Sequence, residues 1–264
     1  MKVNDFCNII EKIAPKRLKE SFDNVGLQVG DKNNEVKKIL VALDCTLDVI
    51  EEAKKESADL IFSHHPLMFI KPSNITTDTL QGKKIIELIK NNISLYSAHT
   101  NLDSVKNGLN DKIVGILGFE SKKIMEVNEE DNESGLGRIV SLDEEKTLED
   151  IINLLKQKLK IKNLRFVGNK VDKIKKIAII NGSGQDFFGN AQREGVNCII
   201  TGDTTYHRVS DFKEIGISII DIGHFYSEWP IMVSLVKDLE KIIKNGENVE
   251  IIFSKVIKDP YEFI

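Results

Sequence analysis

Apolar residues recur along the first half of this chain in two spacings, one typical of helices and one typical of buried strands. Residues 3–16 carry apolar side chains at helical spacing that ends close to Pro15, which predicts an opening helix. Short apolar runs follow at residues 39–43, 60–62 and 93–96, separated by helical patterns at about residues 47–55 and 82–91. Because strands that alternate with helices pair in parallel under a helical cover, this order predicts an α/β fold with a largely parallel sheet.

The same order recurs in the second half of the chain. Three apolar runs there match three runs of the first half in order: 175–180 matches 37–42, 196–201 matches 58–63, and 217–220 matches 93–96. Two of these pairs share one offset and the third is shorter, which predicts an internal duplication of one α/β unit with a trimmed connection. An acidic, polar stretch at residues 128–134 is typical of an exposed loop. We therefore predict two similar α/β lobes with mixed, largely parallel sheets, 1–127 and 128–264, tightly packed or intertwined in one domain.

The charge of the chain limits the partners that it can bind. Lysine and arginine number 37 against 41 acidic residues, and basic and acidic side chains are interleaved, as in residues 51–56. Nucleic-acid binding needs wide basic patches, so the composition gives no nucleic-acid signal. Residues 1–7 lack the basic start and apolar stretch of a signal peptide, and no apolar run reaches membrane-spanning length. We therefore expect a cytoplasmic protein with no membrane partner.

Cysteine contributes no recognisable site. The three cysteines, Cys7, Cys45 and Cys198, are odd in number, far apart and set in apolar surroundings. This pattern indicates neither a disulfide framework nor a cysteine-based zinc site. The sequence predicts buried thiols.

Histidine is rare in this chain, and its placement is the central observation. All five histidines lie beyond a predicted strand: His64, His65, His99, His207 and His224. In open α/β sheets, sites form at the carboxyl ends of the strands. A single histidine is most often just a hydrogen-bonded side chain. Five histidines that all follow strands indicate a site.

Carboxylates accompany the histidines at short spacing. Asp103 lies four residues beyond His99, and Glu228 lies four residues beyond His224. Imidazole suits zinc, iron and similar ions, and carboxylates can bridge two metals. Two adjacent histidines usually point in different directions, so the pair at residues 64–65 serves two metals more naturally than one. We therefore predict a dinuclear metal site between the two lobes.

Each carboxylate also has a purely structural explanation. Ser227 is a plausible N-cap for a helix that begins here, and Pro230 is tolerated in its first turn. Glu228 would then lie in the first turn and only offset the helix dipole. Asp103 would only cap a following helix. Because both carboxylates accompany the histidines, we favour the metal-ligand interpretation.

A glycine-rich segment at residues 181–185 follows the predicted strand at 177–180. Its backbone amides could cradle an anion such as phosphate at the start of a helix. A tight turn between strand and helix needs glycine for geometry alone, and no full phosphate-loop pattern follows, so we favour the geometric explanation. Arg138, Lys71 and Gln28 are further candidates for contact with a substrate.

The motifs together resemble a known family. They lie at residues 22–27, 63–66, 97–103, 201–207 and 223–228. In combination, and over nearly the whole chain, they resemble the Nif-three-like family, also named GTP cyclohydrolase I type 2 homologues. The resemblance implies that two metal ions are held at the positions that match His64, His65, Asp103, His224 and Glu228. It also implies that His99 and His207 lie close to the metals without being standard ligands, as candidates for catalytic proton transfer.

The resemblance carries further expectations about architecture. It implies an α/β fold of two similar lobes and assembly into a toroidal homohexamer. Longer members insert an extra domain between the halves, and a chain of 264 residues is too short to contain it. The acidic stretch at residues 128–134 would mark that junction.

A two-metal site of this kind suits hydrolysis, because two ions lower the pKa of a bridging water and clamp the oxygens of the group under attack. We expect a metal-dependent hydrolase that attacks a small-molecule substrate through a metal-bridged hydroxide, with His99 or His207 transferring a proton. The resemblance implies a GTP cyclohydrolase type of reaction on a nucleotide, although no guanine-reading pattern occurs. The alternatives are a non-catalytic metal-binding regulatory or scaffold protein, and a metal chaperone or store. Zinc, iron and manganese all fit the ligands.

Overall fold

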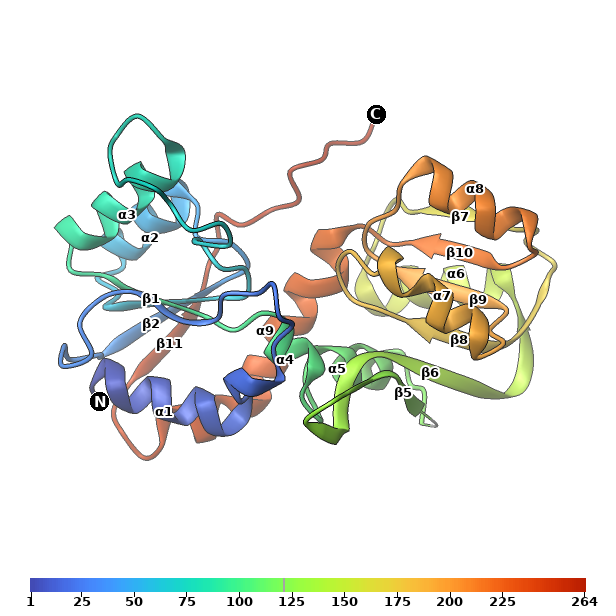
Figure 1. Cartoon of the computed structure of the whole chain (residues 1–264), viewed down its shortest axis with the longest axis horizontal. Coiled ribbons are helices and arrows are strands. Elements are labelled where there is room, and N and C mark those ends of the chain that lie inside the picture. The colour runs from blue at the N-terminus through green and yellow to red at the C-terminus, as the bar shows by residue number, and fades with distance from the viewer. Residues whose placement is uncertain (121) are drawn as a thin grey trace. The chain divides into compact units, whose positions relative to one another are not determined.

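The computed structural model describes residues 1–120 and 122–264, which form two compact units (Figure 1). The first unit comprises Met1–Leu102 and Met232–Lys258, and the second comprises Asp103–Ile231 and Asp259–Ile264. Helix α9 (His224–Lys244) begins in the second unit and continues into the first, so a C-terminal segment joins the N-terminal residues. The units therefore differ in extent from the lobes 1–127 and 128–264, and a folding boundary near residue 127 stays a prediction.

The first unit contains a five-stranded sheet in the order β1-β4-β3-β2-β11. Its strands are β1 (Gly26–Val29), β2 (Lys38–Ala42), β3 (Leu60–Ser63), β4 (Ser94–Ser97) and β11 (Glu250–Phe253). All neighbouring strands are parallel except β1, which runs antiparallel to β4. The three apolar runs predicted as strands are thus confirmed, and they pair in parallel at the centre of the sheet.

Helices cover both faces of this sheet, which explains why its central strands are largely apolar. Figure 1 shows α1 (Val3–Ile13) on one face and α2 (Leu47–Lys55) and α3 (Leu80–Lys90) on the other. On the α1 face, the ring of Phe6 packs edge-on against Phe62 and Tyr96, each with ring centroids 5.5 Å apart. A strand that is buried on both faces is rich in apolar side chains, and the hydroxyls of Ser63 and Ser97 at the strand ends bond to each other at 2.8 Å.

The second unit contains a six-stranded sheet in the order β5-β6-β8-β9-β10-β7. Its strands are β5 (Lys122–Asn128), β6 (Asp131–Thr147), β7 (Arg165–Val167), β8 (Lys173–Ile179), β9 (Cys198–Thr201) and β10 (Ser218–Asp221). Strands β8, β9 and β10 are parallel, and the other pairs are antiparallel. This unit contains α5 (Leu109–Ile116), α6 (Leu148–Leu159), α7 (Phe188–Arg193) and α8 (Tyr206–Glu214), together with the start of α9.

The acidic stretch near the middle of the chain forms a hairpin tip. Strands β5 and β6 are joined by two exposed residues at 129–130, and β6 already begins at Asp131. The tip is largely exposed, as predicted, but part of the predicted loop is strand.

Both units share one four-strand arrangement. In each, an antiparallel edge strand comes first, followed by three parallel strands: β1-β4-β3-β2 in the first unit corresponds to β7-β10-β9-β8 in the second. This shared order agrees with the repeat in the hydrophobic pattern. Its origin by duplication stays a prediction.

Arg138 is buried inside the second unit and is therefore no surface contact for a substrate. Its guanidinium donates to both carboxylate oxygens of Asp111, with Nε–Oδ1 at 2.7 Å and Nη2–Oδ2 at 3.1 Å. Its Nη1 donates to the carbonyl oxygens of Gly135 and Gly137. A buried charge needs partners of this kind, so the arginine joins helix α5 to strand β6.

The cysteines form no disulfide. Cys45 and Cys198 are buried, as predicted, and Cys7 is partly buried. No helix in the described parts of the chain is both long and apolar enough to span a membrane.

Candidate metal centre

Four of the five histidines lie close to the carboxyl ends of parallel strands. His64 and His65 follow β3 directly, and His99 lies two residues beyond β4. In the second unit, His224 lies three residues beyond β10. The predicted position of these residues is confirmed, because the carboxyl ends of parallel neighbours meet at one edge of each sheet.

The three histidines of the first unit form one cluster. The rings of His64, His65 and His99 have centroids 5.1 to 5.4 Å apart. Each ring offers a nitrogen, and these ligand atoms all lie within 4.8 Å of one another. His64 is fully buried and the other two are half-buried. The cluster therefore suits a divalent metal ion, for which imidazole nitrogen is a common ligand.

An oxygen fixes the orientation of each of these rings. The Nδ1 atoms lie near the Ala98 carbonyl oxygen at 2.8 Å for His64, Asp44 Oδ1 at 2.9 Å for His65, and Asp23 Oδ1 at 3.0 Å for His99. A carbonyl oxygen can only accept, so Nδ1 of His64 carries the proton, and carboxylates favour the same tautomer in the other two rings. This leaves the Nε2 atoms as the nitrogens that are available to bind a metal or to exchange a proton.

Asp23 anchors His99 through a small buried network. Its Oδ2 accepts the backbone N–H of Thr100 at 3.0 Å and the Thr100 hydroxyl at 2.5 Å, while Oδ1 faces His99. Burial raises the pKa of Asp23, but the hydrogen bond and charge of His99 and the bonds from Thr100 outweigh burial and lower the pKa to about 2. Asp23 is thus ionised at neutral pH and holds the His99 ring in place.

In the second unit, His224 and Glu228 form a preassembled pair. Helix α9 begins at His224, so the two residues lie one turn apart on the same face, with Nε2 and Oε2 at 2.9 Å. The other ring nitrogen of His224 lies 2.6 Å from Asp203 Oδ2. Two ligand atoms on one tetrahedral zinc ion lie about 3.3 Å apart at ordinary bond lengths. The His224 Nε2 and Glu228 Oε2 atoms therefore lie close to the spacing at which both could bind one ion.

The start of α9 differs from the sequence prediction. Ser227 is not an N-cap: it lies inside the helix, where its hydroxyl donates to the His224 carbonyl at 2.8 Å and accepts the Gly182 N–H at 2.9 Å. Glu228 falls in the second turn and Pro230 in the interior of the helix. The macrodipole acts mainly on the first turn, so dipole compensation explains Glu228 less well than expected.

Glycine allows two loops to approach this pair closely. Gly182 follows β8 with a φ of +58°, and a Cβ there would lie 2.3 Å from Glu228 Oε1. At Gly202, after β9, a Cβ would lie 2.5 Å from the Ser227 hydroxyl. The geometric explanation for the glycine-rich segment is therefore supported, since no other residue fits against Glu228 without displacing it.

The remaining predicted site residues have less defined roles. Asp103 is buried in the short helix α4 (Thr100–Ser104), and its carbonyl accepts the Asn110 amide at 3.1 Å. His207 lies exposed on α8 with its ring edge-on to Tyr206. Among the residues described for the second unit, His207 is not part of a cluster of potential metal ligands. Its catalytic role stays a prediction, as does metal binding by Asp103.

Three aspartates that orient the histidines received no role from the sequence: Asp23, Asp44 and Asp203. Asp44 and Asp203 lie two residues beyond the ends of β2 and β9. The signal that identified the histidines, a polar residue just beyond a buried strand, would also have identified these two.

Comparisons with known proteins agree with the motifs and the fold. The Duf34/NIF3 (NGG1p interacting factor 3) family matches residues 1–260. The chain is 60% identical to the GTP cyclohydrolase 1 type 2 homolog of Clostridium perfringens over 264 residues, which is all of both chains. It is 53% identical to the protein of the same name from Clostridium acetobutylicum, over all of this chain and 99% of the relative.

A solved structure extends the agreement to the fold. Protein SA1388 of Staphylococcus aureus superposes with a TM-score of 0.91 at 31% identity, covering 100% of this chain and 99% of its own. The resemblance noted in the sequence is thereby confirmed. The chain belongs to the Duf34/NIF3 family.

Proposed function

We propose that this protein binds two divalent metal ions through His64, His65, Asp103, His224 and Glu228. The observation that carries the proposal is the orientation of the histidine rings: in His64, His65 and His224 an oxygen lies at Nδ1, which leaves Nε2 as the nitrogen proposed to bind a metal. Such fixed rings favour binding, because little ordering remains to be done when the ion arrives. Zinc, iron and manganese all suit this ligand set.

We further propose that the site is hydrolytic. Bound divalent ions would supply Lewis acidity and make water acidic enough to act as a nucleophile near neutral pH. The protein's own residues contribute orientation and proton transfer. Asp44 and Asp203 hold the rings of His65 and His224, and His99, fixed by Asp23, is placed beside His64 to accept or donate a proton at Nε2. His207 is the second candidate for proton transfer.

A small molecule is the proposed substrate. The relatives from two Clostridium species carry the name GTP cyclohydrolase 1 type 2 homolog, which makes a nucleotide the first class to test. We also propose a homohexameric assembly, which sedimentation velocity would test directly. A stable monomer at micromolar concentration would refute the assembly without affecting the metal site.

Metal analysis combined with a hydrolysis screen tests the function. We expect about two ions per chain in the wild type, and fewer in Glu228→Gln, which removes a charged ligand without changing shape. Glu240→Gln is the matched control, because Glu240 lies on the same helix and pairs only with Lys244 among its described neighbours. Nucleotides, phosphoesters and cyclic amides are then screened with all three proteins.

The outcomes separate the functional classes. Turnover of one substrate class by the wild type and Glu240→Gln, with loss in Glu228→Gln, supports the hydrolase. Metal binding at the proposed stoichiometry without turnover of any class would refute catalysis and favour a regulatory or scaffold role. Equal metal content in Glu228→Gln and the wild type would refute the ligand assignment.

A further inference from the structure

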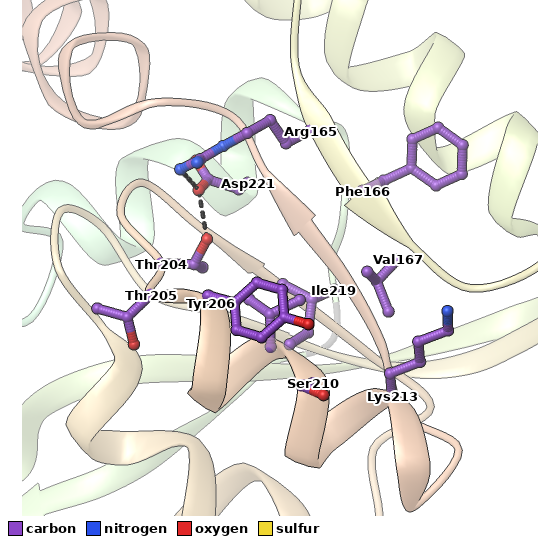
Figure 2. A pocket seen from close by; sticks show the side chains of 11 residues that line it. Arg165, Phe166, Val167, Thr204, Thr205, Tyr206, Ser210, Lys213, Ile219 and Asp221 are labelled. Atoms are coloured by element: carbon purple, nitrogen blue, oxygen red, sulfur yellow. Dashed lines mark hydrogen bonds and ion pairs between the residues drawn. The ribbon is translucent and has the colours of Figure 1, made fainter.

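The second unit contains a cavity that the proposed metal ligands do not use. It has a volume of about 410 Å³ and lies between edge strand β7, strand β10 and helix α8. Figure 2 shows the side chains that line it, and we call it the ring pocket, defined by Arg165, Val167, Tyr206, Lys213, Ile219 and Asp221. Its size falls within the range of small-molecule sites, roughly 300 to 1,000 Å³.

The inner surface of the ring pocket is apolar. Side chains alternate along a strand, so Val167 stands on the same face of β7 as Arg165, and Ile219 on the same face of β10 as Asp221. Val209 of α8 completes this surface. An apolar surface at the bottom of an open cavity favours a ligand with an apolar face, because binding removes that surface from water.

An arginine is held in place at one end of the pocket. Arg165 Nη2 donates to Asp221 Oδ2 at 2.5 Å, and the Thr204 hydroxyl donates to the same oxygen at 2.6 Å. The other carboxylate oxygen accepts the Gly223 N–H at 3.0 Å. Asp221 is buried, whereas the Arg165 side chain is 69% exposed. Within the described structure, the remaining N–H groups of Arg165 have no protein acceptor, so they can bind an anion.

The charges in the pocket favour the same kind of ligand. Lys213 lies at the opposite end, and in the part of the chain that the structure describes it pairs with no carboxylate. Two cations face one carboxylate, which leaves the pocket with an excess positive charge. An anionic group near Arg165 would form charge-assisted hydrogen bonds with the guanidinium.

An exposed aromatic ring supplies a stacking surface. Tyr206 is 80% exposed, and Figure 2 shows its ring in front of Ile219 at the pocket. Stacking a planar ring on an exposed aromatic side chain removes apolar surface from water and so favours binding. A flat ligand inserted here would contact Tyr206 and the apolar surface together.

The ring pocket continues toward the candidate metal residues. Arg165, Thr204 and Asp221 also line a second hollow of about 360 Å³, which contains Asp203 and His224. A ligand held at Arg165 would therefore lie beside the hollow that contains His224. The functional meaning of this closeness to His224 rests on the proposed metal function, whereas ligand binding in the ring pocket is independent of it.

We propose that the ring pocket binds a planar ring compound that carries an anionic group, with the ring on Tyr206 and the anion on Arg165. Purine nucleoside 5′-monophosphate is the probe, because it joins both features. Isothermal titration of the full-length chain compares it with the nucleoside and with inorganic phosphate, in the presence and absence of EDTA. We expect the nucleotide to bind more tightly than either fragment, and EDTA to leave its affinity unchanged.

Matched variants test the assignment of residues. We expect Arg165→Ala and Tyr206→Ala each to raise the Kd about tenfold, and Tyr206→Phe to change it little. Arg208→Ala is the control, because Arg208 is an exposed arginine that lies on α8 with Tyr206 but does not line the pocket. The proposal is overturned if no saturable binding occurs, or if Arg165→Ala binds like Arg208→Ala. Binding that EDTA abolishes would overturn it as well, because it would place the anion on metal ions and leave the proposed metal function standing.

Discussion

The buried pair of Arg138 and Asp111 allows a quantitative test of what stabilises the second unit. The substitution is Arg138→Met, which preserves most of the side-chain length and removes the charge. Arg138 is 1% exposed and Asp111 7% exposed, so water cannot replace the lost guanidinium. Asp111 would lose two charge-assisted hydrogen bonds, and the carbonyl groups of Gly135 and Gly137 would lose their donor.

The expected loss of stability follows from these broken contacts. Removing one partner of a buried ion pair leaves the other charge uncompensated, which destabilises proteins by about 3–5 kcal/mol. A total stability of about 5–15 kcal/mol is typical, so the loss is a large fraction of it. Replacing both residues, in Asp111→Asn with Arg138→Met, removes the stranded charge. We therefore expect the double variant to be more stable than Arg138→Met alone.

Urea unfolding followed by circular dichroism measures the effect, with the midpoint and slope fitted for each variant. Lys170→Met is the control in the same unit, because it breaks the exposed pair with Glu149 and should leave the midpoint unchanged. A free energy of unfolding for Arg138→Met within about 1 kcal/mol of the wild type would contradict this expectation. A double variant no more stable than Arg138→Met would contradict it as well.

Three further predictions address the candidate site and the core. The pKa of Asp23 is lowered to about 2 from an ordinary value near 3.8, so its contribution to stability is present above pH 4 and is lost as the pH falls through 2. We therefore expect the free energy of unfolding, measured with urea between pH 2 and 6, to depend less on pH in Asp23→Asn than in the wild type. Gly182→Ala should lower both stability and metal content, since it adds a clash with the Glu228 carboxylate to the strain of a positive φ. Gly195→Ala is the control: its φ is +68° and the space around its Cβ is open, so it should lower stability only. Burial raises the pKa of Cys45 to about 12 and also raises the pKa of the Cys198 thiol, so neither should react with a thiol reagent at pH 8 until urea unfolds the protein. Reaction of two or more thiols in the native protein would contradict this last expectation.

The order of residues along the chain was sufficient to locate the parallel strands and to place the histidines beyond them. A strand that is buried on both faces is largely apolar, as in β3 and β9, so its ends are visible where polar residues resume. His64, His65 and His224 could therefore be assigned to strand ends from the hydrophobic pattern alone. These assignments need only the pattern of apolar and polar residues along a short stretch of the chain.

Long-range packing, by contrast, set how those residues are held and what surrounds them. The contact between Asp23 and His99 joins residues 76 positions apart, and the contact between Asp44 and His65 joins residues 21 apart. Arg138 was a candidate for contact with a substrate in the sequence, which could not show that its partner, Asp111, lies on another element. The ring pocket likewise exists only because β7 pairs with β10 and α8 lies over the same sheet edge. Hydrophobic periodicity reports which face of an element is buried, but it carries no information on which distant side chain completes a charge or a hydrogen bond.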